Sequence, residues 1–298
     1  MSATAPESAL TKLAMLLAEP MTAANVVEAR GLADQAVQGA RANKETDLLS
    51  AQDLARGLEL RGEFFRLTGD FEEAQNDYFE ALSLLMSARD ARDADEAIGR
   101  VSTGLAVIHD SSGDEGQAKS YYERAIAAFE RMNPPAALDI ADLSNNLAFI
   151  YEASGNYNKA ETLLLSSLST CYQVLGSEHE QTALLYNNVG TLYFKAGHDE
   201  RAQEMHMLSL GVRTSIFGAI HPETAQSHGN LALVFVRSNE LNAAKNHFNK
   251  ALDGLEQDRE NYKEDYETIV ANFRDVLESV EDRKGLMQLD ARIGGFLI

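Results

Sequence analysis

Residues 143–183 read LSNNLAFIYEASGNYNKAETLLLSSLSTCYQVLGSEHEQTA. Within this stretch the apolar residues Leu143, Leu147, Ile150 and Tyr151 recur at positions i, i+4, i+7 and i+8. That spacing is the apolar stripe of an amphipathic helix, so it predicts a first helix, called helix A here.

A turn signal ends helix A. Ser154-Gly155-Asn156 interrupts the stripe, and glycine and asparagine tolerate the left-handed conformation that closes a helix. Apolar spacing resumes at Ala160 and continues to Leu168, which predicts helix B, antiparallel to helix A. A further turn signal at residues 176–180 leads to the next unit.

The same pattern returns through the chain. Asparagine recurs every 42 residues at Asn146, Asn188, Asn230 and Asn272. A turn residue followed by a small residue keeps the same register, at Gly155/Ala160, Gly197/Ala202 and Asn239/Ala244, with weaker copies at Gly69/Ala74 and Gly113/Ala118. Self-similarity of this length predicts a solenoid of stacked helix pairs, because each pair leaves an apolar face that only its neighbour can cover.

These residues resemble the tetratricopeptide repeat family, in the 42-residue form typical of kinesin-light-chain-like arrays. The motifs that carry the resemblance are Leu147-Ala148-x-x-Tyr151 with Ala160, Val189-Gly190-x-x-Tyr193 with Ala202, and Leu231-Ala232-x-x-Phe235 with Ala244. The resemblance covers roughly residues 54–280. It implies an all-α fold, a right-handed superhelical solenoid of antiparallel helix pairs with degenerate terminal capping helices.

The expected organisation has three parts. Residues 1–53 are expected to form N-terminal helices of a degenerate or capping repeat, and residues 54–265 an array of about five repeats. Residues 266–298 are expected to form a C-terminal partial repeat with capping helices. The apolar end, residues 294–298, is expected either to dock on the last unit or to mediate self-association.

Composition narrows the classes of partner. The formal net charge is −20, which repels phosphate backbones and anionic lipid surfaces, so neither nucleic acid nor membrane is an expected partner. The apolar run at residues 13–18 is too short to cross a bilayer and lacks the flanks of a secretory signal, so a cytoplasmic location is expected.

Signals for catalysis, cofactors and metals are absent from the sequence. It contains no phosphate-binding loop, no Gly-x-Ser-x-Gly elbow and no His-Glu-x-x-His motif, which argues against an enzyme and predicts no cofactor. The single cysteine, Cys171, is expected to be a small buried apolar residue. His179 and His221 occupy the same inter-unit turn, where local hydrogen bonding is expected instead of metal binding.

The resemblance also suggests a binding face. In arrays of this family one face of helix A lines the concave groove, and related arrays hold peptides with groove asparagines. Carried over to this sequence, the candidate peptide-binding residues are Asn145, Asn146, Phe149, Asn187, Asn188, Thr191, Lys195, Asn230, Leu233, Arg237 and Asn272. The expected groove also carries four basic residues (Arg56, Arg100, Lys195, Arg237) and four acidic ones (Glu59, Glu63, Asp142, Asp275).

An asparagine amide offers donors and an acceptor, so it can pair with the backbone of an extended peptide without reading its side chains. The leading expectation is therefore a non-enzymatic scaffold that binds an extended peptide or protein segment through an asparagine ladder. Two alternatives remain: a structural subunit that assembles through convex or terminal surfaces, and a peptide-sensing regulatory module. At the level of residues, the alternative is that the asparagines bridge adjacent A helices.

Overall fold

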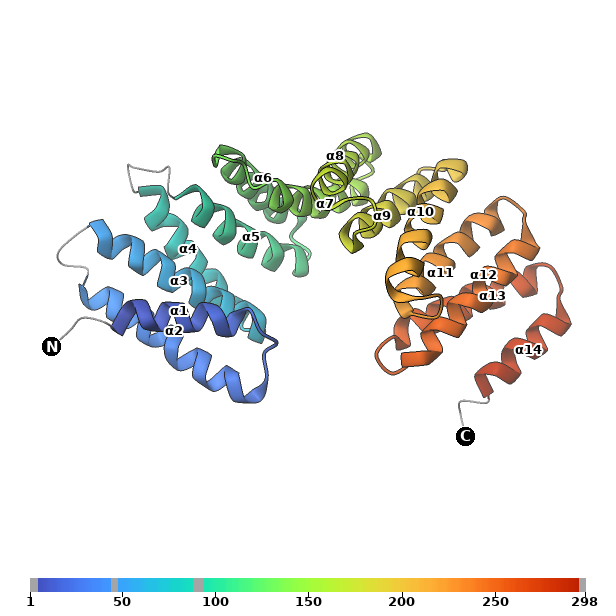
Figure 1. Cartoon of the computed structure of the whole chain (residues 1–298), viewed down its shortest axis with the longest axis horizontal. Coiled ribbons are helices and arrows are strands. Elements are labelled where there is room, and N and C mark those ends of the chain that lie inside the picture. Colours follow the sequence, from blue (N-terminus) through green and yellow to red (C-terminus); the bar gives the residue numbers. More distant parts are fainter. Residues whose placement is uncertain (1–4, 44–47, 88–93, 295–298) are drawn as a thin grey trace. The chain divides into compact units, whose positions relative to one another are not determined.

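The computed structural model describes residues 5–43, 48–87 and 94–294. Over those ranges it contains fourteen α-helices, one short 3₁₀ helix and no β-strand (Figure 1). The all-α prediction is confirmed, and the helices form sequential antiparallel pairs. The chain divides into two compact units, residues 1–150 and 151–298, each of which is described by itself.

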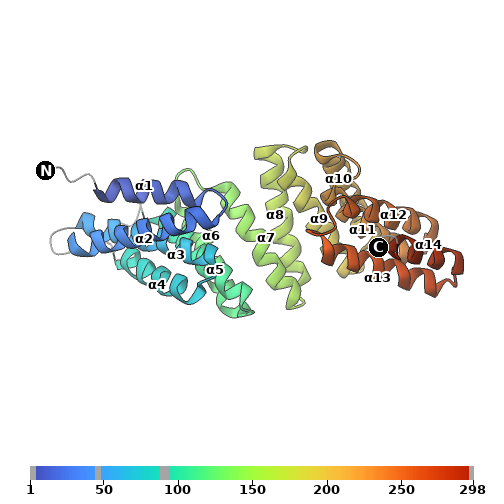
Figure 2. The ribbon, with the colours of Figure 1, turned by 90° about the horizontal axis from the view of Figure 1, so that it is seen from below.

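The first unit consists of helix pairs and the A helix that follows them, seen from a second direction in Figure 2. Its elements are α1 (Ala5–Leu17), α2 (Ala23–Asn43), α3 (Leu48–Thr68), α4 (Phe71–Ser87), α5 (Asp95–Ser111), α6 (Glu115–Arg131) and most of α7 (Ala137–Ala153). Its core includes Leu58, Phe64 and Leu105, all almost fully buried.

The second unit continues the same alternation of A and B helices. Its elements after the end of α7 are α8 (Tyr157–Leu175), α9 (Glu180–Lys195), α10 (Asp199–Phe217), α11 (Pro222–Arg237), α12 (Leu241–Leu255), the 3₁₀ helix η1 (Glu256–Asp258), α13 (Lys263–Ser279) and α14 (Arg283–Gly294). Leu231, Phe248 and Tyr266 lie at the centre of its C-terminal core. None of the described helices has both the length and the apolar composition that crossing a bilayer requires.

The predicted A–B turns are confirmed by backbone geometry. Gly155 has φ +77°, and Asn239, at the equivalent place two repeats later, has φ +60°. Glycine adopts this left-handed region without steric cost, and asparagine tolerates it better than most residues. These residues therefore end one helix and allow the next to fold back along it.

Small side chains permit the close crossing of the two helices in each pair. The B-helix alanines of five repeats are completely buried; they are Ala74, Ala118, Ala160, Ala202 and Ala244. On the facing A helix, a Cβ built on Gly190 would lie 2.8 Å from the ring of His206. The sequence prediction that these positions belong to the core is confirmed.

The turn between repeats also repeats in atomic detail. The imidazole Nδ1 of His179 accepts a hydrogen bond from the backbone N–H of Gln181 at 3.1 Å, and His221 does the same for Glu223 at 3.2 Å. These histidines cap the N-termini of α9 and α11, which confirms their expected local role.

Some expectations stay predictions, and one concerns residues that the structure does not describe. The domain boundaries and the right-handed superhelical path stay predictions. The helices nearest the expected boundaries at residues 54 and 266 begin at Leu48 (α3) and Lys263 (α13). Cys171 is fully buried, as expected. Of the apolar end, Gly294 closes α14, and residues 295–298 lie outside the described residues.

Candidate functional site

The candidate face is built from the A helices, so α9, α11 and α13 carry it in the second unit. Helical geometry brings residues three and four positions apart onto one face, which places Asn187, Asn188 and Thr191 together on α9. Asn188, Asn230 and Asn272 are half-buried, whereas Asn187 is only 7% exposed. The three half-buried amides thus sit at the boundary between the packed interior and solvent.

One pair of asparagines joins adjacent A helices. The Nδ2 of Asn230 on α11 donates to the Oδ1 of Asn187 on α9, with a separation of 2.7 Å. For this pair the sequence-level alternative, a bridge between A helices, is what the structure shows. Asn230 keeps its own Oδ1 and a second N–H, because an amide group has two donors and one acceptor oxygen.

The basic residues of this face are committed to carboxylates of the chain itself. Lys195 forms an ion pair with Glu152 at the end of α7, and Arg237 forms one with Asp199 at the start of α10. Arg237 also donates from Nη2 to the backbone carbonyl of Phe194 at 2.6 Å, and its guanidinium lies 3.5 Å from the centre of the Phe194 ring. Both cations therefore connect neighbouring repeats.

Thr191 and Leu233, the remaining predicted residues of α9 and α11, contact other residues of the chain. Thr191 donates its hydroxyl to the carbonyl of Asn187 at 3.1 Å, within the same helix. Leu233 is partly buried and packs against the C-terminal core. Leu184 lies three residues before Asn187, so helical geometry puts it on the same face of α9, where it is 42% exposed and adds an apolar group.

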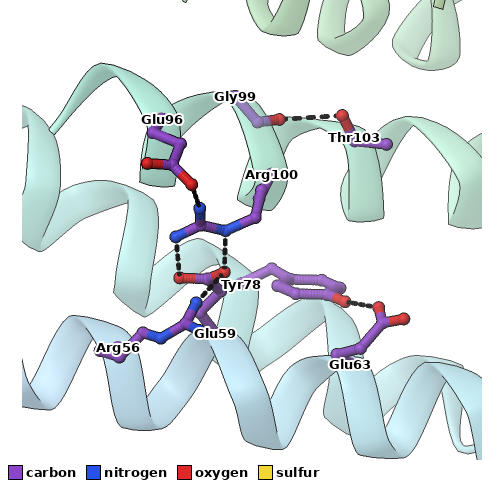
Figure 3. Close-up of polar contacts among 8 residues, drawn as sticks. All are labelled: Arg56, Glu59, Glu63, Tyr78, Glu96, Gly99, Arg100 and Thr103. Carbon is purple, nitrogen blue, oxygen red and sulfur yellow. Dashed lines mark hydrogen bonds and ion pairs between the residues drawn. The ribbon is translucent and has the colours of Figure 1, made fainter. Parts of the chain in front are cut away.

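In the first unit, charged side chains occupy the equivalent face. Glu59 of α3 is almost buried, at 6% exposure, and lies between two arginines (Figure 3). Its Oε1 accepts from Arg56 Nη1 at 2.6 Å and from Arg100 Nε of α5 at 2.5 Å. Arg100 also pairs with Glu96, so two cations and two anions neutralise one another across α3 and α5.

A second polar group lies beside this cluster. The hydroxyl of Tyr78 donates to Glu63 at 2.8 Å (Figure 3). Glu63 also pairs with Arg66. Burial and the nearby Glu63 carboxylate raise the pKa of Tyr78, which keeps the hydroxyl protonated as a donor. Tyr78 also fills the space beside Gly104, where an added Cβ would lie 2.5 Å from its ring.

The other three predicted residues lie on α7 within the first unit. Asn145 donates to Asn146 at 3.3 Å, and both side chains are half-buried. Phe149 is 41% exposed. These residues belong to the first unit and Asn188 to the second, so each set is described by itself.

Sequence reasoning missed the partners of the basic residues. Arg100 and Glu59 are 41 positions apart, and Arg237 and Phe194 are 43 apart, which is close to one repeat. A search for opposite charges one repeat apart would have found Arg100–Glu59 and Lys195–Glu152. The four cations expected on this face are therefore paired with carboxylates of the chain, and a contact between a ligand and Lys195 or Arg237 stays a prediction.

A histidine pair was also missed. His228 and His247 approach through their Nδ1 atoms at 3.0 Å, between α11 and α12. Burial, then the neighbouring His247 and Lys250, lower the pKa of His228 to about 4, so the pair is neutral near pH 7. Across the described residues no group of three or more His, Cys, Asp or Glu side chains could hold a metal ion.

Comparisons with known proteins agree with this architecture. Two tetratricopeptide repeat models match the sequence, one over residues 139–215 and 200–257 and the other over residues 100–130. No curated protein sequence matches the chain.

Solved structures share the fold. BtubC (BKLC) from P. vanneervenii is 25% identical, with a TM-score of 0.64 over 78% of this chain and 90% of that one. The apo form of RapI is 17% identical, with a TM-score of 0.65 over 82% of each chain. NprR, solved in complex with its cognate peptide NprX, is 15% identical, with a TM-score of 0.56 over 96% of this chain and 77% of that one.

Proposed function

Because the chain belongs to the tetratricopeptide repeat family, we propose that it is a non-enzymatic interaction module that binds an extended peptide or protein segment along its A-helix face. The proposed contact residues in the second unit are Asn188, Asn230 and Asn272, with Leu184 as an apolar neighbour. Asn145, Asn146 and Phe149 are the corresponding candidates in the first unit.

The observation that carries the proposal is the internal neutralisation of the cations on this face. Lys195 and Arg237 pair with Glu152 and Asp199, so neither is a free charge for an anionic ligand. Half-buried amides recur on the same face at intervals of one repeat. Amides match the N–H and C=O groups of a main chain, which supports an extended segment as the ligand.

The spacing of the A helices suits such a segment. Packed helices lie about 8–10 Å apart, so two steps from α9 to α13 cover roughly 20 Å. An extended chain advances about 3.3 Å per residue, so about six residues would span the three helices. NprR holds a peptide in its own structure, and at 15% identity it shares only the fold with this chain. The proposal therefore rests on the residues described here.

The proposal is tested with peptides selected from a random library. A phage-displayed dodecamer library is selected on the full chain, and the strongest dodecamer is synthesised with a fluorescent label. Asn188→Ala and Asn230→Ala should each weaken its binding about two- to tenfold, because each removes hydrogen bonds worth about 0.5–1.5 kcal/mol net.

The matched control is Asn246→Ala, which changes an exposed asparagine on the B helix α12. It should leave the affinity unchanged. Selected dodecamers whose binding ignores Asn188 and Asn230 but depends on Asn246 would refute the proposal.

A structural subunit that assembles through the terminal residues remains the second candidate function. It predicts that the particle mass rises with protein concentration and that no peptide binds. We place the protein in the cytoplasm, with proteins and not nucleic acid or membranes as partners, on the sequence grounds of charge and hydropathy.

A further inference from the structure

Asn187 is distinguished from the other asparagines of the face by its burial. Its side chain is 7% exposed, yet its Oδ1 receives the hydrogen bond from Asn230 at 2.7 Å. The bond satisfies a buried acceptor and joins α9 to α11.

The bond fixes how Asn230 presents its amide. A free asparagine side chain can turn its amide by 180° and exchange donor for acceptor. In this pair, such a turn would bring the Oδ1 of Asn230 against the Oδ1 of Asn187. Two acceptor oxygens repel at hydrogen-bond distance, so the amide orientation of Asn187 sets that of Asn230, and with Asn187 oriented as it is here Asn230 retains its Oδ1 and one N–H.

The next repeat has no side chain that could make the equivalent hydrogen bond. The position of α11 equivalent to Asn187 is Gly229, which has no side chain to hold Asn272. A Cβ built on Gly229 would lie 2.5 Å from Cδ1 of Ile269 on α13, so a larger residue there would have to displace the end of the Ile269 side chain. Asn272 therefore serves as a matched control for Asn230.

A second contact holds α9 and α11 together about two helical turns beyond the Asn187–Asn230 bond. Arg237, seven residues after Asn230, donates to the Phe194 carbonyl of α9 at 2.6 Å and packs on the Phe194 ring. This second tether limits sliding of the two helices, so the Asn187–Asn230 contact has a defined geometry.

We propose that Asn187 is a positioning residue that orients the Asn230 amide toward the main chain of the bound segment. The segment residue opposite Asn230 must therefore have a free main-chain N–H. Asn187 acts through Asn230 and does not touch the segment. The Oδ1 of Asn230 accepts from that N–H, so proline or an N-methylated residue is excluded at one position. The inference rests on the proposed function.

A double-mutant cycle with the selected dodecamer tests the positioning role. Asn187→Ala should weaken binding about threefold in the wild-type chain and have no effect in the Asn230→Ala background, because the residue acts only through Asn230. In an Asn272→Ala background, Asn187→Ala should keep its full threefold effect. An equal loss in all three backgrounds would show a merely structural role and overturn the inference.

Ligand chemistry gives a second readout. N-methylation of each dodecamer position in turn should weaken binding at least tenfold at one position in the wild-type chain, and that sensitivity should fall in Asn187→Ala. Uniform tolerance of N-methylation would overturn the inference. The proposed function fails separately, if no dodecamer responds to Asn188→Ala or Asn230→Ala.

Discussion

Acid should destabilise the second unit in part through the buried His206, in addition to the His228–His247 pair. His206 on α10 is 1% exposed, and its Nδ1 has no hydrogen-bond partner. Burial, then the nearby Arg213, lower the pKa of His206 from 6.5 to about 4. The folded state therefore binds this proton less readily than the unfolded state does, so stability falls as the pH drops from about 6.5 towards 4.

The size of the effect follows from the two pKa values. At pH 5 the linkage relation gives a loss of about 2 kcal/mol relative to pH 7, and the full loss below pH 4 is about 3 kcal/mol. His206→Leu removes the titrating group, and the position one repeat earlier is the buried Leu164. The variant should therefore lose less stability between pH 7 and pH 5 than the wild type does.

The assay is urea unfolding followed by circular dichroism at pH 7 and pH 5, with hydrogen exchange of α9 and α10 as a local probe. His198→Gln, which changes an exposed histidine, is the control and should leave the difference between the two pH values unaltered. Equal losses in the wild type and in His206→Leu would refute the reasoning.

Three further outcomes are expected. Ala202→Leu should lower the free energy of unfolding by about 1–3 kcal/mol, because the fully buried Ala202 stands at a close helix crossing; an unchanged melting temperature would show a wrong register. Thr224→Val should cost about 1–2 kcal/mol, because the buried Thr224 hydroxyl donates to the Gly218 carbonyl at 2.8 Å; chemical denaturation measures it, and no loss would contradict this role. If the chain self-associates through its end, deleting residues 293–298 should convert an oligomer to a monomer. Light scattering measures this, and the same number of chains per particle before and after the deletion would remove self-association through the end as a candidate function.

The repeat architecture was predictable because it depends on local and periodic signals. Left-handed turn residues such as Gly155 and buried alanines such as Ala160 report backbone geometry and helix crossing directly. The histidine caps were found for the same reason, since His179 bonds only two residues along the chain. Such signals need no knowledge of distant partners.

The electrostatics of the face could not be read from one helix at a time. A helical wheel places Arg100 and Lys195 toward a groove but does not show that Glu59 and Glu152, one repeat away, reach them first. The Asn187–Asn230 bond was missed as a specific contact because the side chains on both helices decide which bridges form. Whether the face binds a segment stays a prediction.

The central claim is that an extended segment lies on the A-helix face of the second unit. The most direct measurement is the side-chain amide NMR spectrum of the ¹⁵N-labelled full chain during titration with the selected dodecamer. The account predicts that the amide signals of Asn188 and Asn230 shift with the same saturation curve while that of Asn246 stays fixed. Saturable binding that shifts Asn246 on α12 and leaves Asn188 and Asn230 unchanged would contradict it.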